Sequence, residues 1–267
     1  MMNSVFSALK KATLLLAAAG CLAGAAPTPA AAGGLSDLLA GLSVQSGCSQ
    51  FMGPYGYPVP VKYYLPGNSG CAAPAVVLLH GIDGGSRYEG EYEQIGKGLA
   101  AKGYAAFIVY YFEGLPTVPR PGPYDRSLAH PEAFASWVNT AKAGVSYAQS
   151  FPGINPARVA IMGMSLGGFV GTSAAANNPQ VRALVVLSGG MPDMYAKNAR
   201  QMPPTLIVHG QQDRDVPVWE AYKLHDMMAR RGLWNDLDIM PCEAHLPYRN
   251  SRDAVAARVL RFFDSAL

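Results

Sequence analysis

Short runs of aliphatic and β-branched residues alternate with longer helix-like segments, and this alternation constrains the fold more than any other feature of the chain. The predicted strands are residues 59–65, 75–79, 105–110, 158–162, 183–187, 205–208 and 237–240. The predicted helices are residues 92–102, 131–151, 166–177, 217–230 and 252–263. Strands this apolar are buried on both faces, as in parallel sheets that helices cover on both sides. The sequence therefore predicts an α/β protein with a mostly parallel open sheet of about six to eight strands.

The composition is that of a folded domain. Of the 267 residues, 50% are hydrophobic and 15% are charged, which is enough apolar material for a sizeable core. No repeat or second composition regime divides residues 57–267, so we expect one domain there without a separate lid domain. We assign residues 33–56 to an N-terminal extension. The longest irregular connection, residues 111–130, contains four prolines, and we expect it to form a partial rim over the site.

Residues 1–32 have the layout of a secretory signal. Lys10 and Lys11 precede an apolar run over residues 12–26, and small residues follow. Glycines interrupt the run, which makes it a poor membrane anchor. Cleavage after an Ala-x-Ala site is one alternative. The other alternative is a lipoprotein box, a weaker match, after which Cys21 becomes the lipidated first residue. We therefore expect export to the periplasm or the medium, with membrane attachment only through Cys21.

The charge balance gives no reason to expect a nucleic-acid or membrane-surface partner. The net charge is +3, but Lys10 and Lys11 belong to the leader, which has no acidic residue. Without them the 21 basic residues fall to 19, against 18 acidic residues. A nearly neutral body lacks the basic surface that binding to phosphates or anionic lipids requires.

Export permits disulfides among the four cysteines. Cys48 and Cys71 flank a segment rich in glycine, proline and tyrosine, and they are the candidate pair. Their loop of about 22 residues would stabilise the fold by about 3 kcal/mol by restricting the unfolded chain. Cys242 would then be left over, although one sequence does not fix the connectivity.

Residues 163–167 read Gly-Met-Ser-Leu-Gly, a Gly-x-Ser-x-Gly pattern. A β-branched run ends directly before it, and an alanine-rich helical segment begins directly after it. This strand–turn–helix context is typical of a nucleophile elbow, in which a sharp turn exposes the serine and glycines avoid clashes. The alternative is a glycine-rich turn with an unreactive serine. We predict that Ser165 is a nucleophile.

A serine hydroxyl needs a base to accept its proton, and in this arrangement an acid and then a histidine follow the serine along the chain. Of the five histidines, only His245 lies in a loop after the last predicted strand and downstream of a suitable acid. The loop after residues 205–208 contains Asp213 and Asp215, and both are candidates for the acid. Asp193, after the preceding strand, is a third candidate. The aspartates that the triad does not use suit turns and helix starts.

An ester or amide substrate passes through a tetrahedral oxyanion, which needs preset N–H donors. One predicted donor is the backbone N–H of Leu166, directly after the nucleophile. The other should come from residues 80–85, His-Gly-Ile-Asp-Gly-Gly, which follow the strand at residues 75–79. We expect the N–H of Ile82 to be this donor, because His-Gly turns the chain and the next amide points into the site.

The segments LLHGIDGG, GMSLGG, HGQQDRDVP and EAH occur in this order and resemble the α/β-hydrolase superfamily. The run NPARVAIMGMSLGG and the HG-x-x-D-x-x-VP loop are most similar to the dienelactone hydrolase family and related bacterial serine esterases. The resemblance covers residue 59 to the C-terminus and implies an α/β-hydrolase fold. Its Asp-x-x-Val-Pro spacing implies that Asp213 is the triad acid. Asp215 lies just before Val216-Pro217, where proline suits the first helical position, so we predict that it caps the next helix. Dienelactone hydrolases proper use a cysteine nucleophile and are usually cytoplasmic, whereas Ser165 and a leader stand here.

The sequence thus predicts an exported serine hydrolase that acts on small soluble carboxylic esters through an acyl-enzyme. One alternative is a prolyl-oligopeptidase-type peptidase, although the large gating domain of those enzymes is not evident. The other is a non-catalytic binding protein of the same fold, which would typically have lost Ser165 or His245. There is no phosphate-binding or dinucleotide-binding glycine motif, and Cys242-x-x-His245 is only half a zinc motif. We therefore expect neither a cofactor nor a metal.

Overall fold

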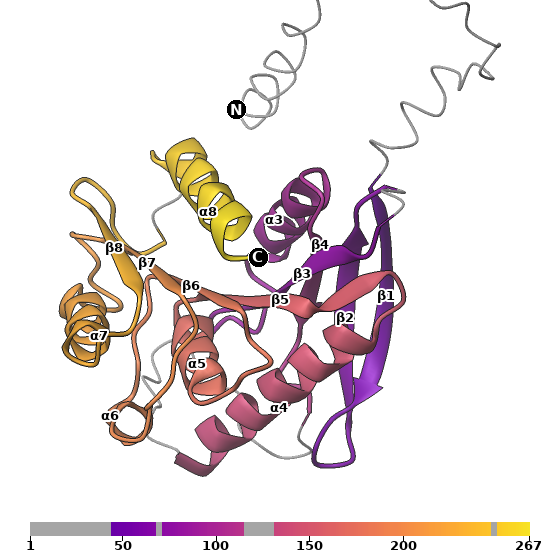
Figure 1. Cartoon of the computed structure of the whole chain (residues 1–267), viewed down its shortest axis with the longest axis horizontal. Coiled ribbons are helices and arrows are strands. Elements are labelled where there is room, and N and C mark those ends of the chain that lie inside the picture. Colours follow the sequence, from indigo (N-terminus) through magenta and orange to yellow (C-terminus); the bar gives the residue numbers. More distant parts are fainter. Residues whose placement is uncertain (1–43, 68–70, 115–130, 247–249) are drawn as a thin grey trace, which may run out of the picture. The chain divides into compact units, whose positions relative to one another are not determined.

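The computed structural model describes residues 44–67, 71–114, 131–246 and 250–267. They form an eight-stranded sheet with helices packed against it (Figure 1). The predicted leader, including Cys21, and residues 115–130 of the predicted rim lie outside the described residues. No helix in the described ranges has both the length and the apolar character that crossing a membrane requires.

The strands and helices follow one another in the predicted alternation. The strands are β1 (Gln45–Met52), β2 (Pro58–Leu65), β3 (Ala73–Leu79), β4 (Ala105–Val109), β5 (Ile154–Met164), β6 (Ala183–Leu187), β7 (Thr205–Gly210) and β8 (Asn235–Met240). The helices are α3 (Glu89–Ala100), α4 (Pro131–Ser150), α5 (Leu166–Ala175), α6 (Asp193–Ala196), α7 (Trp219–Arg230) and α8 (Arg252–Ala266). The short helix α6 was not predicted, because four residues carry no helical period.

The sheet has the order β1-β2-β4-β3-β5-β6-β7-β8. The strands from β4 to β8 in this order run parallel, while β1 and β2 pair antiparallel at one edge. Parallel strands end at the same edge of a sheet, so the loops that follow β3, β5, β7 and β8 all emerge together. The predicted mostly parallel α/β architecture is confirmed.

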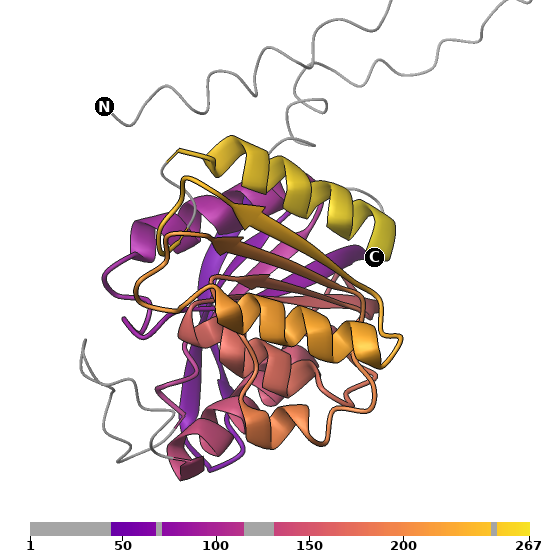
Figure 2. The same cartoon turned by 90° about the vertical axis from the view of Figure 1, so that its left-hand side faces the viewer.

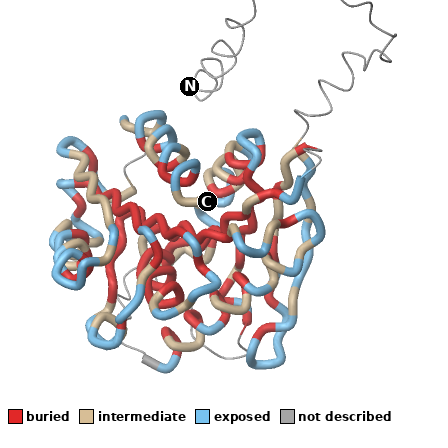
Figure 3. Tube along the Cα trace, in the orientation of Figure 1, coloured by how far each residue is buried: buried red, intermediate tan, exposed pale blue. Residues whose placement is uncertain are grey.

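Helices cover both faces of the sheet. Figure 2 shows α3 and α8 on one face and α4, α5 and α7 on the other. Along β3, Val77 and Leu79 belong to the core on the α4–α5 side, whereas Val76 and Leu78 belong to the core on the α3–α8 side. Both faces of the central strands are buried (Figure 3), which is why these strands are continuous apolar runs in the sequence.

Strand β1 lies within residues 33–56, the predicted N-terminal extension. It pairs along its whole length with β2, so the sheet begins earlier than predicted. Its sequence, QSGCSQFM, is largely exposed at the sheet edge. An edge strand held by backbone hydrogen bonds needs no apolar face, and no hydrophobic pattern therefore indicated it.

The structure contradicts the predicted disulfide. Cys48 lies in β1 opposite Lys62, and Cys71 precedes β3 by two residues. No disulfide joins the two cysteines, and both side chains are exposed. Strands β2 and β4 separate β1 from β3. At about 4.8 Å per strand, the two strands lie about 14 Å apart, beyond the roughly 7 Å between Cα atoms that a disulfide allows.

Candidate active site

Ser165 forms the entire connection between β5 and α5. Strand β5 ends at Met164, α5 begins at Leu166, and the serine backbone has φ 54° and ψ −120°. Such a conformation costs a residue other than glycine about 1–3 kcal/mol, and the surroundings must enforce it. The Ser165 N–H donates to the carbonyl of Leu187 at 2.9 Å, and its carbonyl accepts from the Gly168 N–H at 2.9 Å. The predicted strand–turn–helix elbow is confirmed.

The two glycines of the pattern allow backbone segments to approach closely. A Cβ atom on Gly163 would lie 2.1 Å from the carbonyl oxygen of Gly167. A Cβ atom on Gly167 would lie 2.2 Å from the carbonyl oxygen of Leu79, at the end of β3. A side chain at either position would force these segments apart, so the glycines keep the serine turn tight against the neighbouring strand.

The structure brings Ser165, His245 and Asp213 together. The Nε2 of His245 lies 3.0 Å from the Oγ of Ser165, and its Nδ1 lies 2.7 Å from the Oδ2 of Asp213. The Asp213 side chain is fully buried, while the His245 side chain is 18% exposed. The three residues follow β5, β7 and β8, three strands whose carboxyl ends lie at one sheet edge. This order of hydrogen bonds is the one that a serine–histidine–acid triad requires.

N–H groups surround the carboxylate of Asp213. Its Oδ1 accepts from the backbone N–H groups of Asp215 at 2.9 Å and Val216 at 2.8 Å. Its Oδ2 faces His245 and also lies 3.3 Å from the Nε2 of His209. Burial alone would raise the pKa of Asp213, but the hydrogen bonds from His209 and His245 outweigh burial and lower this pKa below its usual value. The carboxyl group is therefore ionised at neutral pH.

Asp215 is not the helix cap that the sequence predicted. Helix α7 begins at Trp219, with Val218 at the N-cap position and no side-chain hydrogen bond at that cap. Because Asp213 binds the amides that follow it, the chain continues in turns through residue 218 and the helix starts later than predicted. The third candidate acid, Asp193, lies apart in α6, where it forms an ion pair with a lysine of α7.

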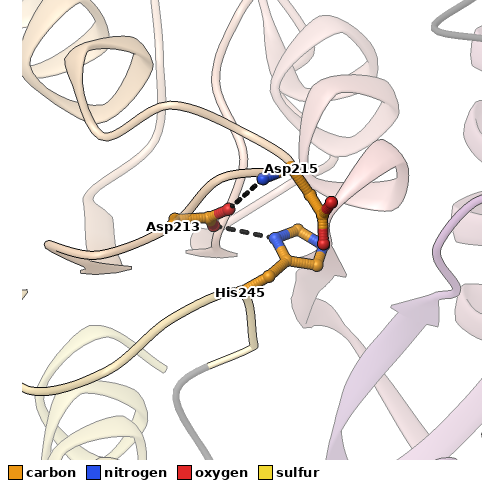
Figure 4. A group of neighbouring side chains, drawn as sticks. All are labelled: Asp213, Asp215 and His245. Carbon is orange, nitrogen blue, oxygen red and sulfur yellow. Dashed lines mark hydrogen bonds and ion pairs between the residues drawn. The ribbon is translucent and has the colours of Figure 1, made fainter.

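Asp213, Asp215 and His245 bring potential metal-ligand atoms within 4.8 Å of one another (Figure 4). Within the described ranges, no other group of three or more such residues lies as close. Both oxygens of Asp213, however, already accept hydrogen bonds from backbone and imidazole N–H groups. Cys242 of the half zinc motif is exposed and does not join the group. The hydrogen bonds therefore fit an imidazole held by a carboxylate better than a metal site.

A buried tyrosine holds the loop after β3 against the serine. The Gly81 N–H donates to the Tyr92 hydroxyl at 2.8 Å, and that hydroxyl donates to Asp83 at 3.3 Å. Burial raises the pKa of Tyr92, and the negative charge of Asp83 raises it further, so the phenol keeps its proton. A Cβ atom on Gly81 would lie 3.5 Å from the Cβ of Ser165, which places this loop directly beside the elbow.

The two predicted oxyanion donors lie on the two segments that meet at Ser165. The N–H of Leu166 is at the first position of α5, where a helix has no internal acceptor. In the described part of the chain, no hydrogen bond uses the N–H of Ile82, while neighbouring amides of its loop do have acceptors. Both N–H groups are thus available to a ligand at the serine.

Sequence reasoning missed two buried residues that contact the site, Tyr92 and His209. The helical pattern predicted Tyr92 as part of a helix, and nothing in that pattern separates a bracing hydroxyl from an ordinary core tyrosine. For His209 a signal was present, because a His-Gly pair ends the strand before the acid loop just as His80-Gly81 ends the strand before the oxyanion loop. Both histidines are fully buried.

Comparison with solved structures gives matches of the same fold at low sequence identity. A Klebsiella pneumoniae protein described as a dienelactone hydrolase has a TM-score of 0.67 and 19% identity, over 83% of this chain and 99% of that chain. The esterase Est22 has a TM-score of 0.65 and 18% identity, over 83% and 81% of the two chains. A puromycin-hydrolyzing peptidase of Mycobacterium tuberculosis has a TM-score of 0.68 and 17% identity, over 85% of this chain but 40% of the peptidase.

Comparison with curated protein sequences gives no match. The sequence profile of the dienelactone hydrolase family, in contrast, matches residues 61–261. This match runs from β2 into α8 and includes the serine elbow, the acid loop and His245. The protein therefore belongs to the dienelactone hydrolase family and is a hydrolase with the α/β-hydrolase fold.

Proposed function

We propose that this protein hydrolyses carboxylic esters with Ser165 as the nucleophile, His245 as the base and Asp213 as the residue that orients His245. The observation that carries the proposal is the continuous chain of hydrogen bonds from Ser165 through His245 to Asp213, which starts at a serine in a strained elbow. A nucleophilic serine that an imidazole activates accounts for both the backbone strain and the imidazole contact, and these two observations support the proposal.

In the proposed reaction, the Oγ of Ser165 attacks the ester carbonyl while the Nε2 of His245 takes the hydroxyl proton. The carbonyl oxygen becomes an oxyanion, which the N–H groups of Leu166 and Ile82 stabilise. The intermediate collapses, the bond to the alcohol breaks, and the alcohol takes the proton from His245. Water then attacks the acyl-enzyme by the same steps and releases the acid and free Ser165. Asp213 stays ionised throughout and stabilises the imidazolium of His245.

Small soluble esters are the proposed substrates. The described residues include no separate lid domain that could cover a long acyl chain. Ser165 also stands where dienelactone hydrolases proper have cysteine, which favours general ester hydrolysis over the cyclic lactone. A series of p-nitrophenyl esters from acetate to palmitate tests this proposal, with the Ser165→Ala variant as the control. We expect kcat/KM to fall with chain length and the rate to show no jump when the substrate forms micelles. A jump at that concentration would contradict the substrate class.

A peptidase is the second candidate, because peptidases are among the structurally similar proteins. The chain spans 40% of the length of the Mycobacterium tuberculosis peptidase. Aminoacyl p-nitroanilides assayed beside the matching p-nitrophenyl esters separate the two activities. Ester hydrolysis predicts turnover of the esters alone, whereas a kcat/KM on the anilides equal to that on the esters would favour the peptidase. A non-catalytic binding protein would hydrolyse neither series above the Ser165→Ala background.

We further propose that the protein is exported, on the basis of the layout of residues 1–32. Mass spectrometry of the mature protein from cells that express the full chain tests this proposal. Cleavage at an Ala-x-Ala site gives a soluble product in the periplasm or medium, whereas lipidation gives a membrane-bound product that begins at Cys21. Cys21→Ala should abolish membrane attachment if the protein is lipidated, and it should change nothing if the leader is cleaved at an Ala-x-Ala site. An uncleaved protein in the cytoplasm would contradict export.

A further inference from the structure

His209 is a fully buried side chain for which the proposed mechanism has no role. It lies near the end of β7, four positions before Asp213. Its Nε2 lies 2.9 Å from the carbonyl oxygen of Val216 and 3.3 Å from the Oδ2 of Asp213. A carbonyl and a carboxylate only accept hydrogen bonds, so the Nε2 of His209 must carry a proton.

The other ring nitrogen of His209 does not compete for these acceptors. The Nδ1 of His209 is buried, and it has no hydrogen-bond partner in the described part of the chain. In that part of the chain, the hydrogen bonds of the ring are therefore made at Nε2, whose N–H points toward Val216 and Asp213.

His209 acts on Asp213 along two paths. Directly, its Nε2 and the Nδ1 of His245 approach the same carboxylate oxygen, at 3.3 Å and 2.7 Å. Indirectly, His209 binds the carbonyl of Val216, while the N–H of Val216 donates to the other carboxylate oxygen at 2.8 Å. His209 thus contacts Oδ2 of Asp213 directly, and it binds the residue whose N–H donates to Oδ1.

We propose that His209 is a positioning residue, whose buried N–H fixes the carboxylate of Asp213 so that Oδ2 faces the Nδ1 of His245. The proposal rests on the ester hydrolase proposed above and deepens it. His209 does not touch the substrate. Without its N–H the carboxylate of Asp213 can rotate away from the imidazole, and His245 then loses the orientation in which Nε2 faces Ser165.

Two amide substitutions test this geometry with matched chemistry. In His209→Gln the side-chain NH₂ reaches about as far as the Nε2 of histidine. In His209→Asn the same group lies one methylene nearer the backbone and falls short of Asp213. We expect His209→Gln to keep kcat within about fivefold, and His209→Asn to lower kcat about 10- to 100-fold, the size of effect that a 1 Å misplacement causes. KM should stay within about twofold in both variants, because neither touches the substrate.

Proton NMR of the resting enzyme gives a second readout that does not depend on turnover. The Nδ1 proton of His245 in its hydrogen bond to Asp213 should give a far-downfield signal in the wild type and in His209→Gln. The signal should broaden or vanish in His209→Asn. Ile207→Val, a core substitution two positions earlier on β7, is the control, because it lowers stability without removing a hydrogen bond to Asp213. It should keep both the signal and kcat.

Equal kcat values and equal signals in His209→Gln and His209→Asn would overturn the proposal. If His209→Asn does not fold, nitrogen NMR of the wild type decides, because a proton on Nδ1 of His209 rather than Nε2 would contradict the assigned contact. Failure of the proposed function has a different outcome. In that case the wild type hydrolyses no ester above the Ser165→Ala background, while the NMR difference between the two amide variants persists.

Discussion

The Nε2 of His245 lies 3.0 Å from the Oγ of Ser165, although 80 positions separate the two residues in the sequence. The parallel sheet explains this proximity. Strands β5 and β8 run in the same direction, so the loops that follow them emerge at the same sheet edge. Neither loop needs to be long: Ser165 directly follows the buried end of β5, and His245 lies five residues after the half-buried edge strand β8.

Replacing Ser165 with alanine should abolish nearly all ester hydrolysis and leave the thermal midpoint close to that of the wild type. The hydroxyl is a reacting group and fills little of the core. Only the contribution of the oxyanion donors and substrate positioning, about 10³–10⁴ over water, should remain. Ser173→Ala is the matched control, because Ser173 lies in the same helix and its hydroxyl donates to the backbone carbonyl of Phe169. Activity of Ser165→Ala within tenfold of the wild type would refute the nucleophile.

Asp213→Asn and Asp215→Asn should differ sharply in activity. The amide of Asp213→Asn no longer holds His245 in the correct tautomer, and kcat should fall on the order of 10⁴-fold. Asp215 is exposed and caps no helix, so Asp215→Asn should change stability by at most about 0.5 kcal/mol and nearly keep kcat. Steady-state kinetics and thermal midpoints of both variants check this prediction. The reverse pattern would assign the acid to Asp215.

The lowered pKa of Asp213 predicts a dependence of stability on acid pH. The folded state favours the ionised carboxylate, so its stabilising contribution is present above about pH 4, the usual value for an unfolded aspartate. It is lost as the pH falls from there through the lower pKa of the folded state. The thermal midpoint of the wild type should therefore drop more steeply below pH 4 than that of Asp213→Asn. If the thermal midpoints of the two proteins fall equally steeply below pH 4, the lowered pKa of Asp213 is contradicted.

Tyr92→Phe should lower both stability and activity. The substitution removes the acceptor of the buried Gly81 N–H, which costs about 1–3 kcal/mol, and it releases the loop that carries Ile82. We expect kcat to fall about tenfold, because the oxyanion donor of Ile82 is less well positioned. Tyr104→Phe removes a tyrosine hydroxyl that binds Asp264 of α8, and it is the control. A loss of stability at Tyr92 without a loss in kcat would contradict the bracing role.

The sequence predicted the parts of the fold that burial dictates. Strands such as residues 183–187 are apolar because both their faces are covered, and each of these predicted runs is a strand in the structure. Strand β1 was not predicted, because an exposed edge strand needs only backbone pairing and carries no apolar pattern. The elbow at Ser165 was predictable because the turn and the glycines that allow it are neighbours in the sequence.

The remaining features depend on contacts between distant segments. The distance between Cys48 and Cys71 follows from the order of strands in the sheet, which the spacing of cysteines does not encode. The late start of α7 follows from the hydrogen bonds that Asp213 makes to the turn after it. The role of His209 depends on which way a buried ring faces, and a strand pattern gives only its burial.

Labelling with a fluorophosphonate tests the central claim most directly, because this probe bonds only to a serine oxygen that a base activates. Intact-protein and peptide mass spectrometry should find one phosphonyl group on wild-type protein, attached to Ser165. Ser165→Ala should remain unlabelled, and Asp213→Asn should react far more slowly than Asp215→Asn. A wild-type protein that stays unlabelled, or a label that persists in Ser165→Ala, would contradict the assignment of Ser165 as an activated nucleophile.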